Sequence, residues 1–279
     1  MHGALPEPAA GVAGRPLPPT SDFSPIAARY DASREVPAAL LHAAFDRFAA
    51  AGLLPQGCRV LDAGCGTGQM SLPLAERGHV VVGFDVSPGM VAIARGKVPA
   101  GAAADYRVSD VRRLPLADGS VDAVIVSKLF QHVPGWEGAC RELLRVLRPG
   151  GAFIHHAERG AFSNPVRRCF AAMAEGVGFA DRFPGMRRRA DLVDLLAAAG
   201  TAAVPVALAD LAWRKTVRYG DAWADLRQRL FAEFWYLPDA AYAQILADTA
   251  DWIAAQPDGA DSVAELAPYL SADIARKAG

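Results

Sequence analysis

The chain has 279 residues, of which 52% are hydrophobic, and a formal net charge of −1 at pH 7. This length suits one generous domain, or one domain with additions, and the apolar content is sufficient for a large core. A net charge so close to zero argues against a protein that binds nucleic acid mainly through its overall charge. No apolar run approaches the ~20 residues needed to span a bilayer. The N-terminus also lacks the basic start and apolar core of a secretory signal.

The four cysteines form no C-x-x-C pair and have no histidine at metal-binding spacing. We therefore expect reduced thiols, no metal site and a cytoplasmic location. Residues 1–21 are rich in proline, glycine and alanine, a composition that predicts a disordered tail. Pro37 then opens a predicted helix, which ends near Gly52 and Pro55.

Strands and helices alternate over the next hundred residues. The strand at 79–84 (HVVVGF) is continuous in apolar residues, as expected of a strand that is buried on both faces. Strands alternating with helices predict a parallel sheet that is covered on both sides. The predicted strands are 59–61, 79–84, 106–108, 121–127 and 152–156, and the predicted helices cover about 70–77, 87–97 and 134–147.

The pattern is less regular beyond residue 156. Residues 157–186 are interpreted as an insertion with helical character around 166–176, followed by a helix over 189–199. Segments 203–208 and 213–218 are the candidates for the last two strands. From 221 to 278 the apolar periodicity predicts helices.

The most informative stretch is VLDAGCGTGQM, Val60–Met70. An apolar strand runs into three glycines, Gly64, Gly66 and Gly68, and then into a helix. Such a turn places backbone N–H groups and the positive end of a helix against a ligand. A dinucleotide loop would have its third glycine where this chain has Gln69, and a phosphate-binding P-loop would need Gly-Lys-Ser/Thr. A tight strand-to-helix turn without a ligand is the alternative reading.

Carboxylates follow three successive strands. Asp62 follows the first, Asp85 ends the second and Asp110 follows the third. Ligands of a doubly wound sheet lie beyond the carboxyl ends of its strands. We therefore expect the three acids to surround one site.

The motif D-x-G-C-G-T-G resembles the first motif of class I S-adenosylmethionine-dependent methyltransferases. The segments GFDVSPGMVAIAR, LPLADGSVDAVIVSKLFQHV and RELLRVLRPGGAFIHH extend the resemblance over about Val60–His156. The chain looks like the subgroup that includes ubiquinone and menaquinone methyltransferases. This implies a doubly wound, Rossmann-like, seven-stranded α/β sheet, mostly parallel with an antiparallel last strand. It also implies an N-terminal helical cap (22–55), a core (56–218) and C-terminal helices that complete the acceptor pocket (219–279).

The resemblance also implies roles for individual residues. Asp85 would accept hydrogen bonds from the ribose, and Asp110 with Val111 would recognise adenine. Asp62 would orient the glycine loop and the methionine ammonium, and Met90 would pack on the adenine. Helix capping, an Asx-type turn and core packing are the structural alternatives. The full predicted cofactor set is Tyr30, Asp62, Gly64, Cys65, Gly66, Thr67, Gly68, Asp85, Val86, Met90, Asp110, Val111 and Ser127.

A sulfonium methyl group is already activated, so aligning it with a nucleophile supplies much of the acceleration. A general base is required only when the nucleophile carries a proton. His132 lies just past the fourth strand, and His155 and His156 end the fifth. Strand alternation sends the last two to opposite faces, so at most one should face the site directly. These three histidines are the candidate bases, although each is more often structural.

The sequence thus predicts methyl transfer from S-adenosylmethionine, with S-adenosylhomocysteine as product, to an O, N or C nucleophile of a small molecule in specialised or quinone-like metabolism. We expect a monomer or homodimer with no nucleic-acid partner and no membrane span. One alternative uses the cofactor without methylation, for example in cyclisation. Others are a macromolecule methyltransferase, a nicotinamide dehydrogenase and a non-catalytic scaffold. We expect the aromatic residues at 231 and 234–236 either to line an acceptor pocket or to pack helices. Arg187–Arg189 is interpreted as a solvated face, with an acid-binding patch as the alternative.

Overall fold

The computed structural model describes residues 21–33, 36–161, 163–179 and 183–279. The predicted tail lies outside these residues except for Ser21. That residue is 8% exposed, and its backbone N–H donates to the carbonyl of His132. Ser21, which the predicted tail included, is therefore packed against the rest of the protein.

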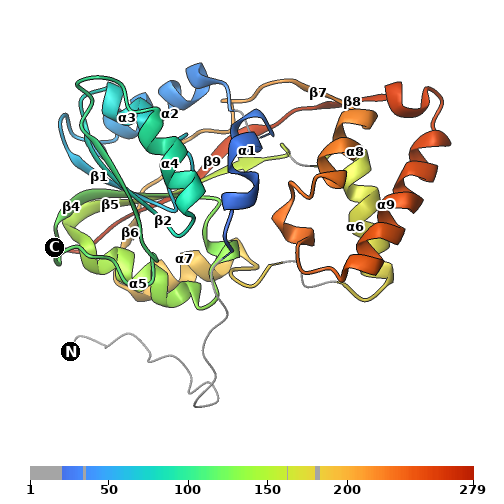
Figure 1. Ribbon diagram of the computed structural model, residues 1–279. Coiled ribbons are helices and arrows are strands. Elements are labelled where there is room, and N and C mark those ends of the chain that lie inside the picture. Colours follow the sequence, from blue (N-terminus) through green and yellow to red (C-terminus); the bar gives the residue numbers. More distant parts are fainter. Residues whose placement is uncertain (1–20, 34–35, 162, 180–182) are drawn as a thin grey trace, which may run out of the picture.

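A seven-stranded sheet forms the larger part of the molecule (Figure 1). Its spatial order is β3-β2-β1-β4-β5-β9-β6. Every neighbouring pair from β3 to β5 is parallel, whereas β9 is antiparallel to both β5 and β6. The predicted fold class is confirmed. The strands are β1 (Arg59–Ala63), β2 (Val80–Asp85), β3 (Ala104–Val108), β4 (Val121–Ser127), β5 (Leu147–Arg159), β6 (Ala202–Ala203) and β9 (Tyr269–Arg276).

Apolar layers cover both faces of this sheet. On one face the layer includes Phe45, Leu74 and Ile154, and on the other it includes Leu143 and Phe153. Burial of both faces explains why the β2 and β4 sequences read as continuous apolar runs. Helices α2 (Ala38–Ala50), α3 (Leu72–Glu76) and α4 (Pro88–Gly96) cover the first face, and α5 (Trp136–Val146) and α7 (Arg189–Ala198) cover the second.

A second, helical lobe lies beyond one end of the sheet (Figure 1). It has its own apolar core, in which the Phe170 ring lies 4.7 Å from Phe234 and 5.0 Å from Tyr242. The helix expected around residues 166–176 is found there. The lobe contains α6 (Pro165–Gly176), α8 (Tyr219–Arg227), η3 (Ala232–Phe234), α9 (Asp239–Ala254), η4 (Gly259–Asp261) and the hairpin of β7 (Lys215–Arg218) with β8 (Val263–Leu266). Short elements η1 (Ser24–Ile26) and α1 (Ala27–Ser33) lie between the lobe and the sheet.

The C-terminal prediction was wrong in one respect. Helices were expected up to residue 278, but residues 263–266 and 269–276 are strands β8 and β9. The segments proposed as the last two sheet strands contribute only the two-residue β6 and the hairpin strand β7. Pro257 and Pro268 cannot lie inside a continuous helix. Pairing with β5 decides the conformation of the alanine-rich β9 sequence, because strand preference depends mainly on tertiary contacts.

Candidate functional site

The glycine loop connects β1 to α3 at the carboxyl edge of the sheet. All three glycines have left-handed backbone angles, with φ of 70° at Gly64, 51° at Gly66 and 80° at Gly68. A Cβ at Gly64 would lie 2.6 Å from Leu129 Cδ1, whereas one at Gly66 would meet open space. Gly64 therefore permits close packing, and Gly66 leaves its backbone exposed to a ligand.

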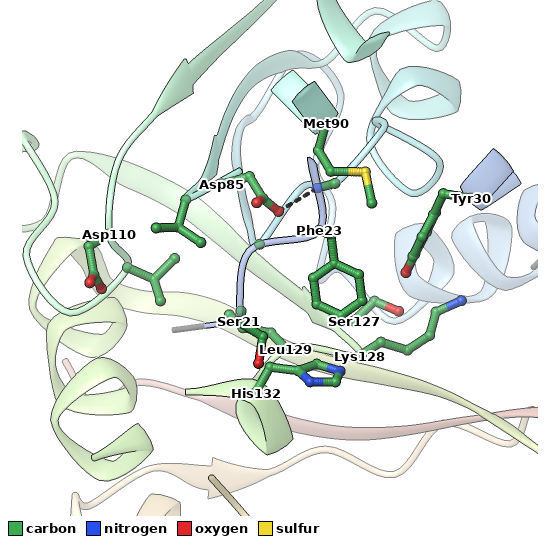
Figure 2. A pocket seen from close by; sticks show the side chains of 14 residues that line it. Ser21, Phe23, Tyr30, Asp85, Met90, Asp110, Ser127, Lys128, Leu129 and His132 are labelled. Atoms are coloured by element: carbon green, nitrogen blue, oxygen red, sulfur yellow. Dashed lines mark hydrogen bonds between the residues drawn. The ribbon is translucent and has the colours of Figure 1, made fainter. Parts of the chain in front are cut away.

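Asp85 supports this loop from the end of β2. Its Oδ2 accepts a hydrogen bond from the Gly66 N–H at 2.9 Å (Figure 2). Its Oδ1 accepts one from the Ser87 N–H at 2.8 Å. Burial raises the pKa of Asp85, and the two backbone N–H groups oppose that rise.

Asp62 lies beneath the loop and is 1% exposed. Its Oδ2 has no hydrogen-bond partner among the described residues. Burial raises the pKa of Asp62 to about 7; the Ser71 hydroxyl opposes this rise, and the negative charge of Asp85 adds to it. A buried carboxyl group with an unused oxygen suits a cationic ligand, which would favour the ionised form.

Asp110 follows β3, and its carboxylate is hydrogen-bonded to Arg112. Its Oδ1 accepts from the Arg112 backbone N–H at 2.9 Å, and its Oδ2 accepts from Arg112 Nη2 at 2.6 Å. Burial favours the protonated form, but the hydrogen bonds from Arg112 hold the pKa of Asp110 below its ordinary value. The Asx-type turn that the sequence left open is therefore present. Val111 and Met90 are buried and line the same cavity as Asp110.

The N-terminal segment closes the cavity that these residues surround. Phe23 lies between Met90, Ser127 and His132 (Figure 2), and its backbone N–H donates to Ser87 Oγ at 2.8 Å. Its ring packs edge-on against His132, with ring centres 5.0 Å apart. The remaining cavity has a volume of about 50 Å³.

Thr67 of the glycine loop also contacts the N-terminal segment. Its hydroxyl donates to Asp31 Oδ1 of α1 at 2.5 Å, and Lys97 forms an ion pair with the same carboxylate. The polar groups around the first cavity fit an adenosyl ligand with an ammonium group. Sites for ligands of that size occupy ~300–1,000 Å³, which is more than the volume that remains beside Phe23. Binding such a ligand therefore requires the Phe23 ring to move.

Nine of the thirteen residues predicted to bind the cofactor line this first cavity. The four others, Asp62, Cys65, Thr67 and Gly68, are not among its lining residues. Burial raises the pKa of the Cys65 thiol. The nine that line the cavity are Tyr30, Gly64, Gly66, Asp85, Val86, Met90, Asp110, Val111 and Ser127.

A second cavity of about 350 Å³ adjoins the first. Phe23, Tyr30, Lys128 and His132 line both. The second cavity extends along β5 toward the helical lobe, whose Arg167, Ala232 and Glu233 form its far wall. Its other lining residues are Gln131, His155, His156, Ala157, Glu158, Arg159, Phe183, Met186, Arg187 and Arg189.

The three candidate histidines lie in three different environments. His132, at the end of η2 (Phe130–His132), lines both cavities and packs edge-on against Phe183 at 5.1 Å. His155 Nδ1 lies 3.4 Å from Asp273 Oδ2 of β9. Both His155 and His156 contribute to the second cavity, so the expectation that at most one would do so was wrong.

His156 is fully buried. Its Nδ1 lies 3.4 Å from Ser127 Oγ, and its Nε2 has no partner among the described residues. Burial, together with the positive charge of Lys128, lowers the pKa of His156 to about 3. The imidazole is therefore neutral throughout the physiological range.

Sequence reasoning missed most of the residues that line the second cavity and several that line the first. Four of the missed residues contact the predicted site residues or close the first cavity. Lys128 has a left-handed backbone, with φ of 54°, and its Nζ donates to Glu158 Oε1 at 2.5 Å. Phe23, Asp273 and Arg112 complete the set. No motif marks them. Lys128, Phe23 and Asp273 act through contacts between distant segments, whereas Arg112 acts through a local turn on Asp110.

Comparison with known proteins adds to this geometry. Residues 61–155 match the family model of a methyltransferase domain. The resemblance of this stretch to S-adenosylmethionine-dependent methyltransferases is thereby confirmed, and S-adenosylmethionine is the cofactor that such a domain uses.

Two curated relatives share sequence with the methyltransferase domain. A malonyl-[acyl-carrier protein] O-methyltransferase from Serratia marcescens is 38% identical over 134 residues, which are 48% of this chain and 50% of that protein. A demethylmenaquinone methyltransferase from Beutenbergia cavernae is 40% identical over 138 residues, which are 47% of this chain and 54% of that protein. The chain thus spans about half the length of the curated relatives it matches.

The structural match extends beyond the methyltransferase domain. A putative methyltransferase from Bacillus halodurans superposes with a TM-score of 0.57 at 19% identity, covering 84% of this chain and 98% of that chain. At this identity the match shows the fold alone. Within the described residues, no helix of this fold is both long enough and apolar enough to cross a membrane.

Proposed function

We propose that the chain transfers a methyl group from S-adenosylmethionine to an O, N or C nucleophile of a small organic molecule in specialised or quinone-like metabolism. The observation that carries this proposal is the pair of adjoining cavities. The first has the glycine loop and acidic residues of a methyltransferase domain, and the second has room for an acceptor. Their common wall includes Lys128 and His132, where the reacting groups would meet.

Different residues of the first cavity would bind different parts of the cofactor. Asp85 would accept hydrogen bonds from ribose hydroxyls while it continues to hold the Gly66 N–H. Asp62 would pair with an ammonium group through its unused Oδ2. Met90 and Val111 would provide an apolar surface for the adenine. The bound cofactor supplies a methyl group that is activated by its sulfonium.

Among the candidate bases, we favour His132 for an acceptor that carries a proton. It is the only one of the three histidines that lines both cavities. The low pKa of His156, about 3, makes that imidazole a weak proton acceptor at neutral pH. His155 instead adjoins the Asp273 carboxylate, deeper in the second cavity.

Calorimetric titration of the full chain with S-adenosylhomocysteine tests the cofactor assignment. Charge-assisted hydrogen bonds contribute roughly 1.5–3 kcal/mol each. Asp85→Ala should therefore weaken binding by at least about tenfold, since ~1.4 kcal/mol is one decade. Asp105→Ala is the matched control, because that exposed acid of β3 pairs only with Arg107 among the described residues.

Equal affinities of the wild type and Asp85→Ala would contradict this assignment. Release of S-adenosylhomocysteine in the presence of candidate acceptors, measured beside a His132→Ala variant, then tests catalysis. A wild-type protein that binds the cofactor but methylates no member of a broad acceptor panel would favour the non-methylating alternative.

A further inference from the structure

Residues 155–159 of β5 all line the second cavity, and we call this strand segment its floor. His155, Ala157 and Arg159 alternate along this strand, so their side chains share a face, and all three line the cavity. At ~3.3 Å per residue, His155 and Arg159 lie about 13 Å apart along the strand. The small Ala157 side chain between them leaves space for a ligand above the strand. A narrow ligand can therefore lie along β5 with its two ends at different polar groups.

The register of the sheet shows which end is nearer the first cavity. Ser127, the last residue of β4, pairs with His156, and β5 continues beyond that point to Arg159 alongside β9. Ser127 lines the first cavity. Arg159 is thus the distal end of the floor, about 10 Å beyond His156 at strand spacing.

Basic side chains outnumber acidic ones around this cavity. Two of the basic residues pair with the two acids that line it: Lys128 with Glu158, and Arg167 with Glu233. A third, Arg189, donates through Nε to Asp273 Oδ1 at 2.6 Å. These pairs neutralise both lining acids, so the cavity offers no uncompensated negative charge to a cationic acceptor. The basic residues are Lys128, Arg159, Arg167, Arg187 and Arg189.

Arg159 differs from these three paired cations. Its Nε donates to Ser271 Oγ at 3.1 Å, and no carboxylate of the described residues lies within ion-pair distance of its guanidinium. The residue is half-buried. Ser271 therefore fixes one side of the guanidinium and leaves its terminal amino groups available. Two parallel N–H groups of a guanidinium match the two oxygens of a carboxylate or phosphate.

We propose that Arg159 binds an oxyanion of the acceptor, and that the acceptor is an elongated organic acid or phosphate ester. Its anionic end lies at Arg159, and its nucleophile lies about 10 Å away at the end of β4, where the two cavities meet. The position of the nucleophile rests on the proposed function, whereas the oxyanion site rests on the second cavity alone. Selection would then depend on the charge and the length of the acceptor together.

Binding of matched probes tests this proposal. The full chain, saturated with S-adenosylhomocysteine, is titrated with 3-phenylpropanoate, phenyl phosphate and the neutral 3-phenylpropanamide. Saturable binding of either anion is expected, with the amide at least tenfold weaker. Arg159→Gln should lose at least tenfold in affinity for the anion, and Arg159→Lys should lose less because it keeps the charge. Arg188→Gln is the control, since Arg188 pairs with Asp191 outside the cavity.

The outcomes distinguish a carboxylate ligand from a phosphate ligand, and they distinguish failure of the oxyanion site from failure of the proposed function. Preference for 3-phenylpropanoate indicates a carboxylic acid, and preference for phenyl phosphate indicates a phosphate ester. Equal anion binding by the wild type and Arg159→Gln, equal binding of the acid and the amide, or no binding of either anion overturns the inference. Failure of the wild type to bind S-adenosylhomocysteine instead overturns the proposed function, and anion titration of the unliganded chain still decides the role of Arg159.

Discussion

The two cavities differ in how their walls are built. The first is formed mainly by residues close in sequence, at the ends of β1, β2, β3 and β4. The second combines β5 with the helical lobe and with residues 183–189. The first is nearly filled by Phe23, whereas the second is open. The first cavity is therefore defined mainly by the motifs at the strand ends, whereas the second, the proposed acceptor site, depends on long-range packing; four residues are common to both.

The largest expected effect is on stability, and it tests whether the helical lobe can unfold independently of the sheet. Phe170→Ala removes a fully buried ring from the lobe core, which typically costs 3–5 kcal/mol. We expect hydrogen exchange to increase over α6, α8 and α9, while the affinity for S-adenosylhomocysteine stays within about twofold. Phe45→Ala, at a matched buried site against the sheet, should instead destabilise β1 and its neighbours. Identical exchange profiles for the two variants would contradict the separation.

A smaller effect is expected from Asp62, because its ionisation is unfavourable in the free protein. The folded pKa of about 7 lies above the ordinary 3.8, so the free energy of unfolding should fall as pH rises from ~4 to ~7. Asp62→Asn removes this penalty. At pH 8 the variant should be more stable than the wild type by about 4 kcal/mol, at ~1.4 kcal/mol per pKa unit over the difference between 3.8 and about 7.

Urea denaturation at pH 4 and pH 8 measures that difference, which should nearly vanish at pH 4. The same variant should bind S-adenosylhomocysteine about tenfold more weakly at pH 8, since it cannot pair with the ammonium group. Wild-type affinity should decrease as pH falls through about 7. A variant that is both less stable and unchanged in binding would show that Asp62 has a purely structural role.

The smallest expected effect concerns the closing segment. Phe23→Ala removes the ring that occupies the first cavity. We expect the association rate of S-adenosylhomocysteine to rise about three- to tenfold in stopped-flow measurements, because the ligand no longer has to displace the ring. An unchanged rate would mean that the segment opens faster than the ligand arrives.

The sequence predicted the first cavity much better than the second. Asp62, Asp85 and Asp110 follow strands whose apolar runs are readable, and parallel strands bring such ends together. The sequence did not show which side chains already occupy these groups: Arg112, two residues away, pairs with Asp110, and Phe23 of the N-terminal segment lies in the cavity. The second cavity depends on β9, whose conformation is decided by pairing with β5 across more than a hundred residues. Neither periodicity nor residue preference records such a pairing.

The position of β9 also has a consequence for the order of assembly. This strand is synthesised after every other strand of the sheet, yet it lies between β5 and β6. It provides Asp273 and Ser271, which position His155 and Arg159 from 118 and 112 residues away. Contacts of such separation form slowly because long loops must close first. A growing chain can therefore assemble the glycine loop and its acids while the floor of the second cavity is still incomplete, so the first cavity can begin to form before the proposed acceptor site does.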